Sequence, residues 1–167
     1  MAIRRRTYVA FDGDEDMHYF RLMKAWKTHE GFSFDLLDAH DLKQSRDTSS
    51  EEKIKRSLRK RLRKSTVFAL LIGRSTKFLY RFVRWEIETA LKIGLPIIGV
   101  NLNGTRRHDP DLCPPILRDQ LAIYVSFNAK IIEHAIDHWP DQCLELGRQG
   151  VSGPYYYNDS IYARLAL

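Results

Sequence analysis

The chain has 167 residues, of which 44% are hydrophobic and 29% charged, which is typical of a single water-soluble globular domain. No apolar run is long enough to span a membrane, and the residues after the N-terminal arginines lack the apolar region of a signal peptide, so we expect no membrane association. The net charge of +6 is local, because residues 53–64 carry eight cations and no acid and the remainder therefore carries −2.

Strand and helix patterns alternate along most of the chain. In chain order the predicted elements are a strand over 7–11, a helix over 17–30, a strand over 32–37, a helix through 64, a strand over 67–72, a helix through 82–91, a strand over 97–100, a helical turn over 116–120, a strand over 122–127 and a helix over 129–146 with a break at Pro140.

Local signals set several of the boundaries. Ser49, with Glu52 three residues later, predicts a capping box at the start of the second helix. Gly94 predicts the end of the helix that contains residues 82–91. Residues 38–50 form a polar loop that is long for its place between a strand and a helix.

Five alternations of strand and helix predict a three-layer α/β fold of flavodoxin-like type, with a five-stranded central parallel sheet. We expect one domain over residues 1–148. Residues 149–167 form a tyrosine-rich tail that packs on this domain or on a partner. The two cysteines, Cys113 and Cys143, fit no framework of disulfides, so we expect a reducing, cytoplasmic location.

Ligands of such sheets bind where the parallel strands end. The side chains and backbone groups that the sequence places there or just beyond, and that we take as candidates for substrate binding, belong to Phe11, Asp12, Asp38, Gly73, Ser75, Phe82 and Trp85. The aromatic rings suit a nucleotide base, although helical geometry turns Trp85 toward solvent, and Ser75 with the amides near Gly73 suits a ribose or a phosphate. The sequence contains neither a GxGxxG nor a Walker A motif.

Glu86 is the candidate catalytic residue. On a helical wheel it lies one turn after Phe82, on the flank of an apolar stripe, so its carboxylate is expected to be partly desolvated. Composition alone favours an ordinary surface glutamate of an amphipathic helix.

Residues 82–91 read FVRWEIETAL and resemble the aromatic-Val-x-x-Glu-Ile-x-x-Ala-Leu signature of TIR domains. The resemblance covers about residues 6–128 and is nearest to bacterial TIR-like proteins such as the TIR-like subunit of Thoeris anti-phage defence systems. It implies that residues 38–50 form the loop that gates the site and mediates self-assembly, and that Glu86 is catalytic. Phe82 stands where many members have Trp, and Ala10, Phe11 and Asp12 replace the Tyr-Ser or Phe-Ser of others.

The implied activity is cleavage of the nicotinamide–ribose bond of NAD, which is substrate rather than cofactor. Glu86 would stabilise the positive charge that grows on the anomeric carbon. A second acid could then activate water, or a nucleophile of the adenine could capture the carbon and give a cyclic ADP-ribose isomer as a signal; capture by another nucleophile is equally open. A phage-derived trigger and a neighbouring copy of the chain are implied as partners.

Two other functions remain open at this stage. The first is a non-catalytic interaction module that assembles through residues 38–50 and the basic helix. The second is a magnesium-dependent nuclease, with the acidic residues 12–16 as ligands, although such acids are more often found at a helix start and we predict no metal site. The basic residues 53–64 have little aromatic interleaving, which favours a solvated face or a subunit contact over nucleic-acid binding.

Overall fold

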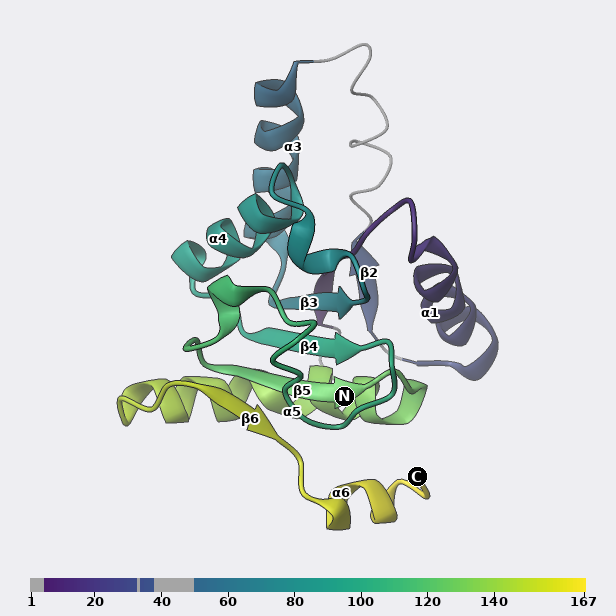
Figure 1. Ribbon diagram of the computed structural model, residues 1–167. Helices are drawn as coiled ribbons and strands as arrows, with labels where there is room; N and C mark the ends of the chain where they lie inside the picture. The colour runs from purple at the N-terminus through teal and green to yellow at the C-terminus, as the bar shows by residue number, and fades with distance from the viewer. Residues whose placement is uncertain (1–4, 33, 38–49) are drawn as a thin grey trace.

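The computed structural model describes residues 5–32, 34–37 and 50–167. A six-stranded parallel sheet forms its centre, in the order β2-β1-β3-β4-β5-β6 (Figure 1). The strands are β1 (Arg6–Ala10), β2 (Asp35–Leu37), β3 (Val67–Ile72), β4 (Ile97–Asn101), β5 (Ala122–Ser126) and β6 (Pro154–Tyr156). The helices are α1 (Met17–Glu30), α3 (Glu51–Lys64), α4 (Val83–Ile93), α5 (Ala129–Arg148) and α6 (Asp159–Arg164), with 3₁₀ turns η2 (Thr76–Phe78) and η3 (Pro115–Leu117).

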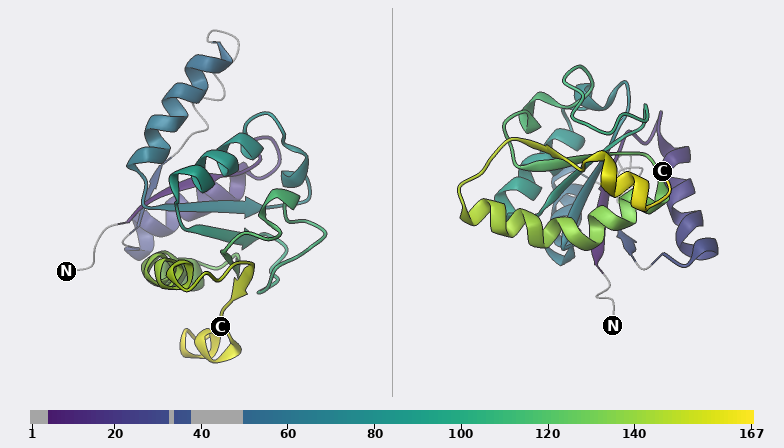
Figure 2. Two further views of the ribbon diagram at one scale, coloured as in Figure 1. Left: turned by 90° about the vertical axis from the view of Figure 1, so that its left-hand side faces the viewer. Right: turned by 90° about the horizontal axis from the view of Figure 1, so that it is seen from below.

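Helices cover both faces of the sheet and give the expected three layers (Figure 2). One core cluster joins the sheet to α1 and α5, and it contains Phe20 and Ile132. The other cluster joins the opposite face to α3 and α4, and it contains Leu58 and Ile87. All six residues of β3 are buried because this central strand is covered on both sides, as its continuous apolar run predicts. The α/β class and the parallel sheet are confirmed.

The number of strands was predicted wrongly. Residues 154–156, within the predicted tail, pair in parallel with β5 and add a sixth strand at the edge of the sheet. Three residues beginning with a proline are too short for an alternating pattern, so sequence periodicity does not reveal this strand. The tail also contributes Tyr157 and Tyr162 to the core cluster that contains α5.

Two helix details differ from expectation. Ser50, rather than Ser49, caps α3, and its hydroxyl accepts a hydrogen bond from the amide of Lys53 at 3.3 Å; Ser49 lies outside the described residues. Helix α5 runs through Pro140 without the predicted break, and Pro140 is buried with Trp139 against the sheet. Packing of this long helix outweighs the lost backbone hydrogen bond. Gly94 ends α4 in the left-handed conformation, with φ of 85°, as predicted.

The connections that follow the neighbouring strands β1 and β3 lead to helices on opposite faces of the sheet. Helix α1 follows β1 and packs on one face, whereas α4 follows the neighbouring β3 and packs on the other. Such a switch point opens a crevice beyond the carboxyl ends of the two strands, which is the place where ligands of open α/β sheets bind. Among the described helices, none has both the length and the apolar character needed to cross a membrane.

Candidate functional site

Glu86 lies in the first turn of α4 and its side chain is fully buried, with 0% exposure. The sequence predicted only partial desolvation, because a wheel drawn for one helix leaves out what packs beside it. In the structure α3 lies next to α4, and its residues Ile54, Leu58 and Leu62 share a core cluster with Phe82. Phe82 is the N-cap residue of α4, and its backbone carbonyl accepts a hydrogen bond from the amide of Glu86 at 2.8 Å.

The hydroxyl of Tyr8 donates a hydrogen bond to Oε2 of Glu86, and both side chains are fully buried. Tyr8 lies in β1, where its ring stacks on Phe68 of the adjacent β3. A buried tyrosine hydroxyl needs a polar partner, and a buried carboxylate is costly unless it is hydrogen-bonded. This bond therefore fixes the orientation of Glu86 between the sheet and α4. Sequence analysis took Tyr8 only as a strand residue; its hydroxyl within an otherwise apolar run is the signal that a polar partner lies opposite.

We expect Tyr8→Phe to destabilise the fold by about 1–3 kcal/mol, because it removes the hydroxyl that satisfies a buried carboxylate. A double-mutant cycle with Glu86→Ala, which removes the acceptor, followed by urea unfolding, should give a non-additive coupling of about 0.5–3 kcal/mol. Tyr80→Phe makes the same change on a ring that is 65% exposed and should have no measurable effect. Additive effects of Tyr8→Phe and Glu86→Ala would mean that the two groups do not interact in solution.

Asp12 and Ser75 come together at the carboxyl ends of β1 and β3. The Ser75 hydroxyl donates to Oδ2 of Asp12 at 2.5 Å, and Oδ1 of Asp12 accepts the amides of Asp14 and Glu15 at 3.0 and 3.3 Å. The Gly73 amide, which we predicted to be available to a phosphate, instead donates to the Thr76 hydroxyl at 2.8 Å. Asp12 is therefore a structural acceptor that ties the turn after β1 to the turn after β3.

Asp16 stands apart from this network. Only 7% of the residue is exposed, and its Oδ2 is buried without a hydrogen-bond partner among the described residues. The carboxylate rests on the Cα of Gly73, where a Cβ would come within 2.4 Å of Oδ2, so this close approach requires glycine. Burial, and next the charge of Asp12, raise the pKa of Asp16 above its usual value.

The raised pKa predicts how stability changes with pH. The folded state disfavours the ionised form of Asp16, so the parent protein loses stability as pH rises through the ordinary aspartate range, and the loss is complete above the raised pKa. Asp16→Asn should therefore raise the melting temperature at pH 7 and change it little at pH 3.5. Asp14→Asn, which removes an exposed acid two residues away, is the control. A gain of the same size at both pH values would contradict this assignment.

The predicted aromatic residues do not gather in one place. Phe11 stacks on Phe20, with ring centroids 4.9 Å apart, inside the core cluster of α1 and α5. Phe82 belongs to the cluster on the opposite face of the sheet. Phe11 follows the end of β1 and Phe82 is the N-cap residue of α4, so the sheet lies between the clusters in which the two rings pack. Asp38 lies outside the described residues.

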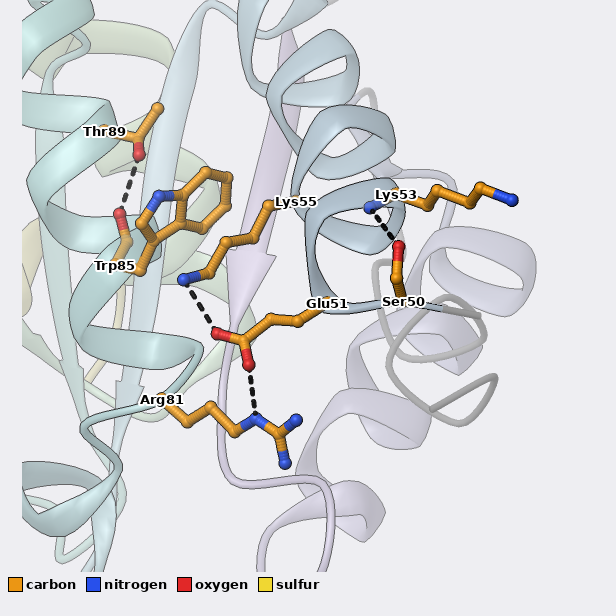
Figure 3. Close-up of polar contacts among 7 residues, drawn as sticks. All are labelled: Ser50, Glu51, Lys53, Lys55, Arg81, Trp85 and Thr89. Carbon is orange, nitrogen blue, oxygen red and sulfur yellow. Dashed lines mark hydrogen bonds and ion pairs between the residues drawn. The ribbon is translucent and has the colours of Figure 1, made fainter. Parts of the chain in front are cut away.

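Trp85 faces α3 rather than solvent, contrary to the wheel. The ammonium of Lys55 and the guanidinium of Arg59 both lie 5.6 Å from its ring, as cation–π contacts. At the same junction Glu51 accepts from Lys55 at 2.9 Å and from Arg81 at 3.1 Å, which joins the start of α3 to the segment before α4 (Figure 3). Part of the basic helix thus serves the packing of α3 against α4, just beside Glu86.

Within the described residues, no group of three histidine, cysteine, aspartate or glutamate side chains could hold a metal ion. In the acidic turn that suggested a nuclease, both carboxylate oxygens of Asp12 accept hydrogen bonds from groups within the protein.

Comparison with protein families matches residues 8–107 to the family described as Thoeris protein ThsB, TIR-like domain. The matched segment begins at Tyr8, includes Glu86 and ends after β4. Comparison with curated proteins finds no match.

Proposed function

Because the chain belongs to the TIR-like domain family of Thoeris protein ThsB, we propose that it consumes NAD and converts it to an ADP-ribose-derived signal in anti-phage defence. Membership gives the chain a TIR-like, defence-related role. The finer proposal is that it cleaves the nicotinamide–ribose bond, with Glu86 as the catalytic residue and a cyclic nucleotide as the product.

The observation that carries this proposal is the environment of Glu86. Its carboxylate is buried at the start of α4, one turn after the aromatic Phe82, and accepts a hydrogen bond from the hydroxyl of Tyr8. A surface glutamate of an amphipathic helix, which composition alone favoured, has none of these features. Burying a carboxylate costs free energy, and buried ionisable groups concentrate at functional sites.

The chemistry follows from the charge that develops on the substrate. As the C–N bond breaks, neutral nicotinamide leaves with the bonding electrons and the anomeric carbon becomes cationic. A carboxylate held in a low-dielectric site stabilises this cation more strongly than it stabilises the ground state. A nucleophile of the adenosine half then attacks the carbon and loses its proton, which closes the ring; attack by water gives linear ADP-ribose instead.

Glu86 has no exposed surface in the single chain, so the proposal requires that binding of NAD or assembly of several copies open a path to it. We propose self-assembly through residues 38–50 and the neighbouring helices, set off by a phage-derived trigger. Activity should therefore rise more steeply than in proportion to protein concentration.

Because Glu86 has no exposed surface in the single chain, a second function is also possible in which the chain is a TIR-like module that binds partners and performs no chemistry. Phe78 and Tyr80, which are 59% and 65% exposed just before α4, would then serve as contact residues. Measurement of NAD and nicotinamide by mass spectrometry distinguishes the two, because only the enzyme releases nicotinamide.

A further inference from the structure

A cavity of about 550 Å³ lies between the second half of α5 and the edge strand β6 (Figure 1). Its walls include four aromatic residues and two acids: Trp139, Tyr155, Tyr156, Tyr157, Asp141 and Glu145. All of them lie beyond residues 8–107, which match the family, and the floor belongs to the core cluster across the sheet from α4 and Glu86. The cavity is therefore a place for a small ligand that the proposed function does not use.

Contacts within the protein hold the aromatic walls in place. Trp139 and Tyr157 are almost completely buried and form the floor, and the Tyr157 hydroxyl donates a hydrogen bond to Oε1 of Gln142 at 3.3 Å. Tyr155 is half-buried and leans on Trp139, with ring centroids 5.9 Å apart. Tyr155 therefore supplies an aromatic wall that is fixed before a ligand arrives and still partly accessible to one.

Neighbouring tyrosines of the same C-terminal segment already carry cations on their rings. The guanidinium of Arg107 lies 4.4 Å from the ring centroid of Tyr156, and that of Arg106 lies 4.1 Å from the ring centroid of Tyr162. In the described part of the chain no cation lies over the Tyr155 ring. Tyr155 is thus the tyrosine of the cavity whose ring can accept a cation from a ligand.

Two carboxylates determine which charge the cavity accepts. Asp141 and Glu145 lie one turn apart on α5, and the described residues that line the cavity include no lysine, arginine or histidine. Asp141 lies 3.6 Å from Arg5, and Glu145 lies 4.0 Å from Arg148 and accepts a hydrogen bond from Gln149 at 3.1 Å. The two acid side chains are 84% and 62% exposed, so these ion pairs contribute little and a ligand can compete with them. The cavity therefore disfavours an anion and favours a cation.

We infer that this cavity binds a small organic cation, in which a quaternary or other substituted ammonium group is carried on an apolar body. The ammonium group rests on the ring of Tyr155, whose negative face attracts it, and lies near Asp141 and Glu145. The apolar body covers Leu146, which also lines the cavity. The inference goes beyond the proposed function and does not depend on it.

Ligand-observed NMR titration of the purified chain with acetylcholine tests this inference. The matched probe is the neutral ester in which a tert-butyl group replaces the trimethylammonium group, because the two molecules share their shape and differ in charge. We expect the parent to bind acetylcholine about tenfold more tightly than the neutral ester. Tyr155→Leu keeps an apolar side chain without the ring, and the double variant Asp141→Asn/Glu145→Gln removes both exposed charges. Each should lower the preference to about threefold or less.

Asp137→Asn is the control, because Asp137 lies one turn before Asp141 on α5 and does not line the cavity; it should keep the parent preference. Equal binding of the two probes by the parent, no binding of acetylcholine at millimolar concentration, or the full preference in either variant would overturn the inference. The comparison of the probes uses only the parent protein, so it decides the matter even if a variant fails to fold. NAD cleavage without acetylcholine binding would sink this inference alone, and the opposite result would sink only the proposed catalysis.

Discussion

Glu86→Gln should lower the rate of NAD loss by at least about a hundredfold, which is the scale of removing one charged or hydrogen-bonding group that stabilises a transition state. Glutamine has nearly the same shape and still accepts the hydrogen bond of the Tyr8 hydroxyl, so the packing around it is kept. What the variant lacks is the negative charge opposite the developing cation. Since the neutral amide is cheaper to bury than a carboxylate, its stability should equal or exceed that of the parent.

Glu88→Gln is the matched control, because Glu88 lies two residues along the same helix and pairs with Arg84 at 3.0 Å near the surface. It should keep the parent rate. NAD loss is measured at equal protein concentration under the conditions in which the parent is active, with circular dichroism to verify the fold. A Glu86→Gln variant that turns over NAD as fast as the parent would show that Glu86 is not the catalytic residue.

Gly99→Ala should destabilise the domain by about 1–3 kcal/mol, the usual cost of overpacking a core. Gly99 lies in the middle of β4, and a Cβ there would come within 2.5 Å of the Tyr124 ring and 3.1 Å of Ile72. Tyr124 is fully buried in the neighbouring strand and its hydroxyl lies 3.4 Å from Sγ of Cys113, so the ring has no room to move away. Urea unfolding of the parent and the variant gives the difference.

Gly147→Ala makes the same chemical change where nothing lies within 4 Å of the added carbon. Gly147 is in the last turns of α5, where alanine is the better helix former, so this variant should gain about 0.4–1 kcal/mol. Opposite signs for the two substitutions would confirm that ring contact, and not the loss of glycine itself, sets the cost at Gly99. Equal stability of Gly99→Ala and the parent would contradict the packing between β4 and β5.

Much of the fold was predictable because its signals are local. The run over residues 67–72 is apolar throughout, since β3 is buried on both faces, and α1 spans residues 17–30 as its periodicity predicts. Gly94 ends α4 because it adopts a conformation that side chains disfavour. The sixth strand was missed because three residues carry no period, and its existence depends on pairing with β5.

The candidate site was only partly predictable because it depends on contacts between distant segments. Glu86 could be singled out by its neighbours in sequence, but its partner Tyr8 lies 78 residues away and only the packing of α4 on the sheet brings them together. Phe11 and Phe82 are both aromatic, yet Phe11 packs in the core cluster of α1 and α5, whereas Phe82, at the start of α4, packs on the opposite face of the sheet. The buried Asp16 resembled any acid at a helix start until the approach of Gly73 was known.

Release of nicotinamide from NAD tests the account most directly. The purified chain at high concentration is incubated with NAD, with and without extract of phage-infected cells, and the nucleotides are identified by mass. We expect nicotinamide to appear in step with NAD loss, together with a product of the mass of cyclised ADP-ribose. NAD that stays intact in every condition, infected extract included, would contradict the enzymatic role and leave the interaction module.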